Sequence, residues 1–173
     1  MLIVLIGYRC SGKTSVGQCV ASILKWQFID SDAVIEERTG KSIEEIVGTD
    51  GWSAFRKEEE KAIKRFASLD KTVLATGGGT ILNPANRELL IKHGILIWLQ
   101  ADITTIKNRM SRDGKTASQR PGLTDMGSME EIEAVLLERT PYYQNAAAYV
   151  IDTSKKSIYE IADEIVTLIK QHP

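Results

Sequence analysis

The sequence predicts an α/β fold in which helices cover both faces of a parallel β-sheet. Short apolar runs of the kind that form buried strands alternate with segments whose apolar residues recur at helical spacing. Strands and helices that alternate in this way form parallel sheets covered on both sides. We find no internal repeat, low-complexity stretch or interdomain linker in the 173 residues. We therefore expect a single domain over residues 1–173, with three α/β/α layers and a five-stranded parallel sheet.

Five apolar runs are the expected strands: Leu2–Ile6, Gln27–Ile29, Thr72–Ala75, Ile95–Leu99 and Tyr149–Ile151. An apolar stripe at helical spacing follows the first run, at Val16, Cys19, Val20, Ile23 and Leu24. Another predicts a C-terminal helix, at Ile158, Ile161, Ala162, Ile165, Leu168 and Ile169. Helix starts between them are indicated by the capping boxes Ser42–Glu45 and Ser128–Glu131 and by Asn83 before Pro84. Because ligands of such sheets bind at the carboxyl ends of the strands, we expect the site in the segments that follow them.

The composition excludes some classes of partner. With 43% hydrophobic residues, 26% charged residues and a net charge of −1, the chain lacks the basic surplus expected for binding nucleic acid or anionic membranes. Cys10 and Cys19 form no disulfide framework and suit a reducing compartment. The run LIVLI is too short for a signal peptide, and no apolar run could span a bilayer. We expect a cytoplasmic monomer whose ligands are small molecules.

The segment that follows the first strand has the pattern of a phosphate-binding loop. Gly7 to Thr14 reads GYRCSGKT, which matches G-x-x-x-x-G-K-T. Gly7 and Gly12 permit backbone conformations in which successive N–H groups point at one anion. The helix that begins near Lys13 adds the positive end of its dipole. We expect Lys13 to reach the β- and γ-phosphates of a nucleotide and the Thr14 hydroxyl to ligate Mg²⁺; the alternative is an ordinary glycine turn.

Two acidic residues follow the second strand. Asp30 and Asp32 come directly after Phe28 and Ile29, and residues two apart in an extended segment point the same way. One carboxylate beside Mg²⁺ would hold the metal, and the other would accept a proton from an attacking hydroxyl. The alternative is that Asp30 or Ser31 only caps a helix that starts near Ala33, which would explain one acid but not the pair.

Two arginines interrupt apolar helix faces and indicate a second anion site. Arg56 and Glu59 share a predicted helix face with Trp52, Ile63 and Phe66. A buried charge requires a partner, so this pair either forms a structural ion pair or lines a wet pocket. A further arginine, Arg139, lies seven residues after Ile132 on the inward face of another predicted helix. Two guanidinium groups from separate helices fit the carboxylate of a ligand.

Two further segments carry ligand-binding signals. Gly77, Gly78 and Gly79 end the third strand, and three consecutive glycines indicate close approach of the backbone to a ligand. The polar stretch around residues 112–127 has no apolar period; it is either a surface loop or a mobile lid. In a lid, Arg120 would lie over the transferring phosphoryl group and stabilise its charge.

Six patterns occur in a fixed order along the chain: GYRCSGKT, FIDSD, FRKEE, ATGGGT, QRPGL and LLERTPYY. In this combination the chain resembles the shikimate kinases, small P-loop kinases related in fold to nucleoside-monophosphate kinases, over nearly its whole length. The resemblance implies a P-loop kinase domain with a mobile lid. It also implies Mg²⁺- and ATP-dependent phosphorylation of the 3-hydroxyl of shikimate, giving shikimate 3-phosphate and ADP, on the route to chorismate and aromatic amino acids.

The resemblance also implies roles for individual residues. The nucleotide would be bound by Arg9, Cys10, Ser11, Gly12, Lys13, Thr14, Ser15, Arg109 and Arg120, with Arg109 against adenine and Arg120 in the lid. Mg²⁺ would be held at Thr14 and Asp30. Shikimate would be bound by Asp32, Arg56, Glu59, Gly78, Gly79 and Arg139. The first three of these lie in a substrate-binding helical segment of about residues 32–66. Lys13, Asp32 and Arg120 would be catalytic, with Asp32 as the base and Glu59 orienting Arg56.

The chain departs from the family pattern at two places. Trp52, in DGWSAFR, stands where the family usually has glutamate, and Gly122 stands where it more often has a bulkier residue. We expect Trp52 to alter packing or helix-start electrostatics without abolishing catalysis, and Gly122 to loosen lid closure.

Some features of the sequence are compatible with other functions. A gluconate kinase or nucleoside-monophosphate kinase shares the first loop, and gluconate also carries a carboxylate and hydroxyls. A GTP-dependent switch is disfavoured because the chain lacks N-K-x-D and D-x-x-G patterns. A catalytically inactive nucleotide-binding module is disfavoured because Lys13, Asp32 and both arginines are present.

Overall fold

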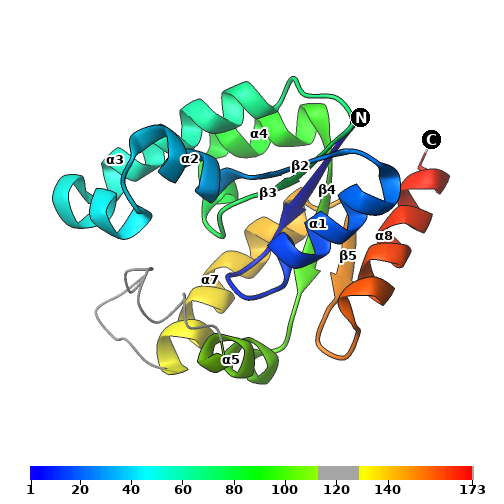
Figure 1. Ribbon diagram of the computed structural model, residues 1–173. Coiled ribbons are helices and arrows are strands. Elements are labelled where there is room, and N and C mark those ends of the chain that lie inside the picture. The colour runs from blue at the N-terminus through cyan, green and yellow to red at the C-terminus, as the bar shows by residue number, and fades with distance from the viewer. Residues whose placement is uncertain (113–128, 173) are drawn as a thin grey trace.

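The computed structural model describes residues 1–112 and 129–172, apart from the side chains of residues 129–131. Five strands in this part of the chain form one parallel sheet in the order β2-β3-β1-β4-β5 (Figure 1). They are β1 (Leu2–Ile6), β2 (Gln27–Asp30), β3 (Thr72–Ala75), β4 (Gly94–Gln100) and β5 (Tyr149–Asp152). The predicted strands are confirmed, with one or two residues added to β2, β4 and β5.

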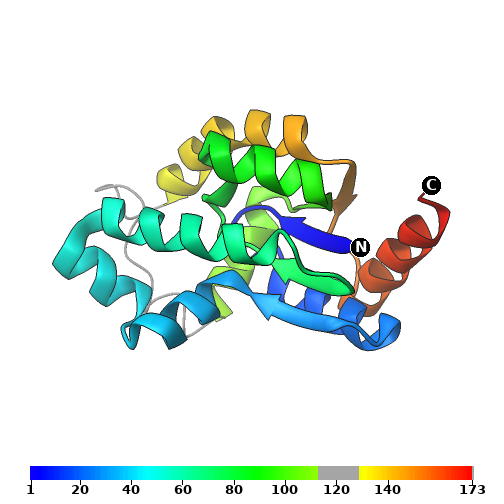
Figure 2. The ribbon, with the colours of Figure 1, turned by 90° about the horizontal axis from the view of Figure 1, so that it is seen from above.

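The described helices pack on both faces of this sheet. They are α1 (Lys13–Leu24), α2 (Ser31–Thr39), α3 (Ile43–Phe66), α4 (Pro84–His93), α5 (Ile103–Arg112), α7 (Met129–Ala146) and α8 (Ile158–Gln171), with a short 3₁₀ turn η1 (Thr80–Leu82). Viewed from above, α4 and α7 lie on one side of the sheet and α8 lies on the other, packed against α1 (Figure 2). The expected three-layer α/β/α arrangement is therefore confirmed.

The first strand explains why both faces are covered. All five residues of β1 are buried, as in a strand at the centre of a parallel sheet. Because side chains alternate along a strand, Leu2, Val4 and Ile6 join the core that contains residues of α3, α4 and α7. Ile3 and Leu5 join a separate core formed with α1 and α8. An uninterrupted apolar run thus stabilises two layers of helices at once.

Most of the helix starts read from the sequence are present. The Asn83 side chain caps α4 before Pro84, and the Ser42–Glu45 capping box forms both of its hydrogen bonds. A further capping box at Ser157 and Glu160 begins α8 and was overlooked in the sequence, although it has the same S-x-x-E pattern. The expected box at Ser128 lies outside the described residues.

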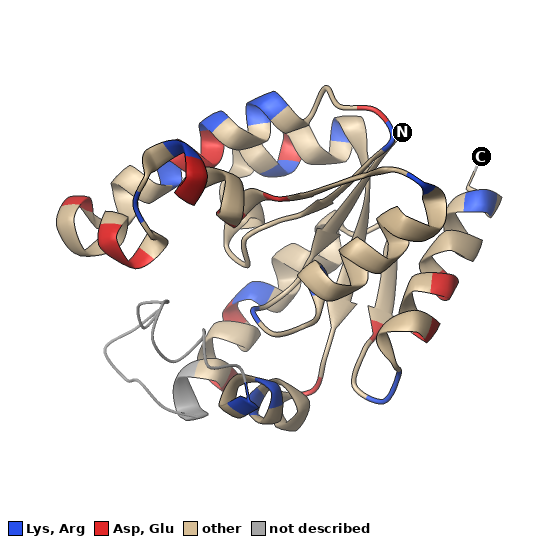
Figure 3. Ribbon diagram, in the orientation of Figure 1, with Lys and Arg blue, Asp and Glu red and all other residues tan. Residues whose placement is uncertain are grey.

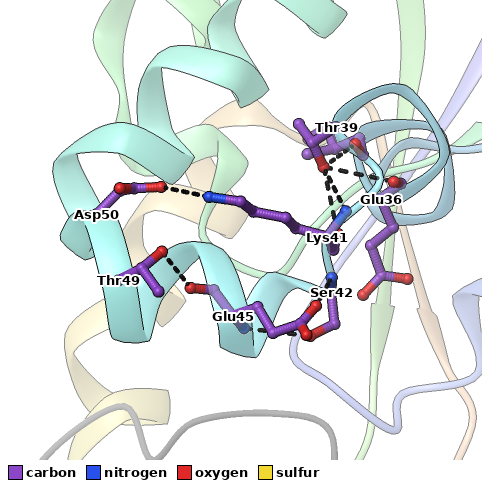
Figure 4. Close-up of polar contacts among 8 residues, drawn as sticks. Glu36, Thr39, Lys41, Ser42, Glu45, Thr49 and Asp50 are labelled. Carbon is purple, nitrogen blue, oxygen red and sulfur yellow. Dashed lines mark hydrogen bonds and ion pairs between the residues drawn. The ribbon is translucent and has the colours of Figure 1, made fainter.

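The turn between α2 and α3 is held by polar contacts (Figure 4). The Ser42 hydroxyl accepts from the Glu45 N–H, and the Glu45 carboxylate accepts from the Ser42 N–H. The hydrogen bond from the Ser42 N–H keeps the pKa of Glu45 below its usual value. Lys41 forms an ion pair with Asp50 (3.1 Å) across the same turn. These contacts fix the direction in which α3 leaves α2.

Within α3, Gly51 interrupts the helical geometry with φ 79° and ψ 167°. A positive φ of this kind favours glycine because a Cβ would be strained there. The bend separates the first turns of α3 from the half that carries Trp52, Arg56 and Glu59. It therefore sets the direction in which these side chains enter the site.

The carboxyl ends of β2, β3 and β1 meet at one edge of the sheet because these strands are neighbours. This brings the GYRCSGKT loop after β1, the acidic residues after β2 and the three glycines after β3 to the same place. Among the described residues, no helix is long and apolar enough to cross a membrane. Lysines and arginines lie interspersed with acidic residues on α3, whereas α8 has its acidic residues in its first half and one lysine, Lys170, near its end (Figure 3).

Candidate active site

The loop from Gly7 to Thr14 joins β1 to α1 and has the backbone of an anion-binding nest. Three of its residues have positive φ: Gly7 (141°), Cys10 (60°) and Gly12 (101°). Gly12 is the N-cap of α1, so the helix dipole points its positive end at the loop. The Lys13 ammonium lies over the loop, where it donates to the carbonyls of Gly7 (2.9 Å) and Tyr8 (2.7 Å).

The end of β2 contributes two carboxylates. Asp30 caps α2 by accepting from the N–H groups of Asp32 (3.1 Å) and Ala33 (3.4 Å) through one oxygen. Its other oxygen accepts from the Thr14 hydroxyl (2.8 Å). Asp30 thus acts as a cap and also contacts the phosphate loop. The expectation of an extended Asp30–Asp32 segment is wrong, because the chain enters α2 at Ser31.

Arg56 is held in place by a buried glutamate. The Arg56 guanidinium donates to Glu59 (2.7 Å), whose side chain is fully buried. The second oxygen of Glu59 accepts from the Thr80 hydroxyl (2.6 Å), and Thr80 is also fully buried. A buried carboxylate with two donors stabilises the position of the arginine. The Arg56 side chain keeps 31% of its surface exposed, which leaves the guanidinium accessible to a ligand.

Aromatic rings and a glycine bound the other sides of Arg56. Its Cζ lies 5.4 Å from the Trp52 ring centroid and 5.3 Å from that of Phe55, within cation–π range. A Cβ at Gly79 would lie 2.5 Å from an Arg56 nitrogen. Glycine is therefore required at position 79 for the guanidinium to lie beside the backbone. Trp52, the residue that departs from the family pattern, packs directly on this arginine.

Arg139 lies on α7, a different helix from the one that carries Arg56. It is 8% exposed, and its Nε makes no hydrogen bond within the described part of the chain. One turn further along α7, the Tyr143 hydroxyl donates to the Gly78 carbonyl (2.5 Å). Burial raises the pKa of Tyr143 to about 12, although Arg139 opposes this shift, so the phenol remains a donor at neutral pH. A Cβ at Gly78 would lie 3.7 Å from an Arg139 nitrogen, so this arginine reaches the glycine turn.

These groups line one pocket. Its empty space is about 550 Å³, the opening to solvent included. The lining residues are Tyr8, Arg9, Asp32, Ile43, Trp52, Phe55, Arg56, Glu59, Gly77, Gly78, Gly79 and Arg139. A neighbouring pocket over the phosphate loop is lined by Arg9, Cys10, Gly12, Lys13, Thr14, Ser15, Asp30, Asp32, Thr76 and Gly78. Asp32 belongs to both pockets, so one carboxylate lies between the arginines and the phosphate loop.

Arg109 lies on the far side of the phosphate loop, on α5. Its guanidinium donates to the Cys10 carbonyl (3.3 Å) and to the carbonyl (2.6 Å) and hydroxyl (3.1 Å) of Thr153. With residues of the phosphate loop and of α8, it lines a third pocket. Ser11, which was expected to contact the nucleotide, is only 1% exposed as a whole residue and therefore offers a ligand almost no surface. Arg120 and the expected lid, residues 112–127, lie outside the described residues except for Arg112, the last residue of α5.

Four residues of the site were not given a role from the sequence: Ser31, Thr80, Tyr143 and Thr153. The Ser31 hydroxyl accepts from the Gly77 N–H (3.1 Å) and is fully buried. Thr80 supports Glu59, and Tyr143 supports Gly78. Their partners are distant in sequence, so no local pattern reveals them. Ser31, Thr80 and Tyr143 do lie within the patterns FIDSD, ATGGGT and LLERTPYY, whereas Thr153 lies in none of the six.

The donor groups fit a nucleotide with Mg²⁺. The loop offers backbone N–H groups in a nest and one ammonium for phosphate oxygens. Mg²⁺ is usually held by one or two carboxylates, hydroxyl groups, phosphates and waters, not by a full protein cage. The Thr14 hydroxyl and the Asp30 carboxylate, already 2.8 Å apart, are suitable oxygen ligands. The described residues contain no cluster of three His, Cys, Asp or Glu side chains that could hold a metal.

The fold and this site define a P-loop phosphotransferase that binds an anionic second substrate. A family model described as shikimate kinase matches residues 9–170, and the chain belongs to the shikimate kinase family. The shikimate kinase of Syntrophus aciditrophicus is 42% identical over 172 residues, which cover 95% of this chain and 88% of that protein.

Solved structures agree with this assignment. The shikimate kinase of Acinetobacter baumannii, solved in complex with shikimate, has a TM-score of 0.91 and 34% identity, covering 98% of this chain and 93% of that one. A gluconokinase from Sinorhizobium meliloti has a TM-score of 0.62 and 19% identity, covering 98% and 91%. At that identity the gluconokinase shows a shared fold only, so the comparisons favour shikimate kinase over the gluconate alternative.

Proposed function

We propose that this protein transfers the γ-phosphoryl group of ATP to the 3-hydroxyl of shikimate, giving shikimate 3-phosphate and ADP on the route to chorismate. The observation that carries the proposal is the single pocket in which Arg56, Arg139 and Asp32 meet beside the phosphate loop. Shikimate has one carboxylate for the two arginines and vicinal hydroxyls for the aspartate. Membership of the shikimate kinase family supports the same substrate and the use of ATP with Mg²⁺.

Each group has a role in positioning or in charge stabilisation. The forks of Arg56 and Arg139 bind the carboxylate and fix the orientation of the ring. The backbone at Gly78 and Gly79 allows the ring to approach closely. Asp32 accepts the proton of the attacking hydroxyl, and Lys13 balances charge on the phosphates. When bound at Thr14 and Asp30, Mg²⁺ supplies further charge for the phosphoryl group in transfer.

The proposal extends to organisation and location. We propose that α2 and α3, within residues 32–66, form the substrate-binding segment, and that Arg120 acts from a lid. We propose an active monomer without nucleic-acid or membrane partners; the net charge of −1 supports the second part of this proposal, because the chain has no basic surplus to bind either polyanion. The free cysteines Cys10 and Cys19 suit a reducing cytoplasm.

A coupled assay of ADP release tests the substrate. Purified protein with Mg²⁺ and ATP is given shikimate, gluconate or each nucleoside monophosphate in turn. We expect turnover with shikimate and at most background with the others, because only shikimate fits both the arginine pair and the ring-hydroxyl contacts. Formation of shikimate 3-phosphate is checked by ³¹P NMR. Turnover with gluconate or a nucleoside monophosphate alone would contradict the proposal.

A further inference from the structure

Thr153 follows β5 directly and connects three segments that are distant in sequence. It is fully buried, and its hydroxyl lies 3.1 Å from the Ser11 carbonyl of the phosphate loop. The same hydroxyl lies 3.1 Å from the Gln100 carbonyl at the end of β4 and 3.1 Å from Arg109 Nη1. A hydroxyl has one proton, so it accepts from Arg109 and donates to only one of the two carbonyls.

The backbone settles which carbonyl receives that proton. The Gln100 carbonyl already accepts from the Thr153 N–H at 2.8 Å, whereas the hydroxyl is the one described side-chain donor to the Ser11 carbonyl. The hydroxyl proton therefore stabilises the structure most when it is directed at Ser11. The Thr153 backbone is itself anchored, because the neighbouring Ser154 hydroxyl accepts from the Asp102 N–H (3.0 Å).

The contact acts on a strained part of the loop. Cys10 has φ 60°, a left-handed conformation that costs a non-glycine residue about 1 kcal/mol or more and persists only when its surroundings hold it. Arg109 donates to the Cys10 carbonyl, and Thr153 donates to the next carbonyl, that of Ser11. Because a trans peptide places C=O and the following N–H on opposite sides, holding the Ser11 carbonyl directs the Gly12 N–H away from Thr153.

We propose that Thr153 is a positioning residue that holds the phosphate loop in its anion-binding conformation, acting through the Ser11 carbonyl and Arg109. This inference rests on the proposed nucleotide site. A pre-formed nest binds phosphates without the free energy needed to order the loop, so loss of the hydroxyl weakens phosphate binding. Shikimate binding is unaffected, because Thr153 lines neither the arginine pocket nor the glycine turn.

The test compares Thr153→Val, which removes the hydroxyl at nearly constant shape, with Thr153→Ser, which keeps it. The matched control is Thr72→Val: Thr72 is also fully buried and donates to a carbonyl, that of Asp70, but it starts β3 at the opposite end of the sheet. Isothermal titration calorimetry measures Kd for ADP with Mg²⁺, for inorganic tripolyphosphate with Mg²⁺, and for shikimate. Thermal unfolding of each variant is recorded in parallel.

We expect Thr153→Val to weaken the binding of ADP and of tripolyphosphate by about tenfold each. Thr153→Ser and Thr72→Val should each change these two Kd values by less than about threefold. Equal affinity of Thr153→Val and the wild-type protein would overturn the inference. The inference would also be overturned if Thr153→Ser lost as much affinity for ADP as Thr153→Val does. It would be overturned as well if Thr153→Val lost affinity for shikimate to the same extent, or lost affinity for ADP but not for tripolyphosphate. Failure of the wild-type protein to bind ADP or tripolyphosphate would instead overturn the nucleotide site itself, and the inference with it.

Discussion

Replacing Asp32 with asparagine is expected to lower kcat by about 10²- to 10⁴-fold, with a much smaller change in KM for shikimate or ATP. Asp32 lines both the arginine pocket and the phosphate-loop pocket, so its carboxylate lies between the two pockets proposed for shikimate and for the nucleotide. Asparagine has nearly the same shape but cannot accept the proton of the attacking hydroxyl. Steady-state kinetics with each substrate varied in turn measures the effect.

The matched control for this variant is Asp163→Asn, which makes the same chemical change on the exposed side of α8. It should leave both constants unchanged. Because Asp32 lies in the first turn of α2, thermal unfolding must also be compared with that of the wild-type protein. Unchanged turnover in a folded Asp32→Asn variant would remove Asp32 as the base.

Replacing Arg139 with alanine is expected to weaken shikimate binding by about ten- to hundredfold while nucleotide affinity changes little. The guanidinium reaches the glycine turn but does not line the phosphate-loop pocket, so its loss should be confined to the acid substrate. Titration calorimetry with shikimate and with ADP measures the two affinities separately.

Arg65→Ala provides the comparison for Arg139→Ala, because Arg65 is an exposed arginine on α3 that does not line the arginine pocket. It should bind shikimate like the wild-type protein. Arg139→Lys tests geometry, because an ammonium keeps the charge but loses the planar fork. Wild-type shikimate affinity in Arg139→Ala would show that the carboxylate is bound elsewhere.

Local sequence patterns predicted the strands, the phosphate loop and the inward faces of helices well. The apolar run Leu2–Ile6 is buried along its whole length, and the glycine spacing of the phosphate loop correctly indicated the positive φ of Gly7 and Gly12. The inward position of Arg139 also followed from helical spacing, since a period of 3.6 residues fixes which side chains share a face. These features depend on neighbours within a few residues.

Other features depend on contacts that no local pattern contains. Thr153 reaches Ser11 across 142 positions of sequence, and Tyr143 reaches Gly78 across 65. The geometry of Asp30 and Asp32 was misjudged for a different reason. Asp30 caps α2, so the chain turns into a helix where extended backbone was expected. Both carboxylates still line the phosphate-loop pocket, but they do so from the N-terminus of α2 and not from an extended segment.

Trp52 illustrates how a departure from a family pattern can be interpreted once contacts are known. From the sequence it was only a change in packing or charge at a helix start. In the structure its ring lies over the Arg56 guanidinium and against Phe55, with ring centroids 6.0 Å apart. An aromatic ring on this face helps to hold the arginine that the buried Glu59 orients.

The central claim is that two guanidinium groups from separate helices bind one carboxylate and so present a hydroxyl to the phosphate loop. It is tested most directly by comparing kcat/KM for shikimate with that for its methyl ester, which keeps the ring and its hydroxyls but has no negative charge. With the wild-type protein we predict a value about a hundredfold lower for the ester, and a much smaller difference with Arg139→Ala. Equal kcat/KM for the acid and the ester in the wild-type protein would contradict the claim.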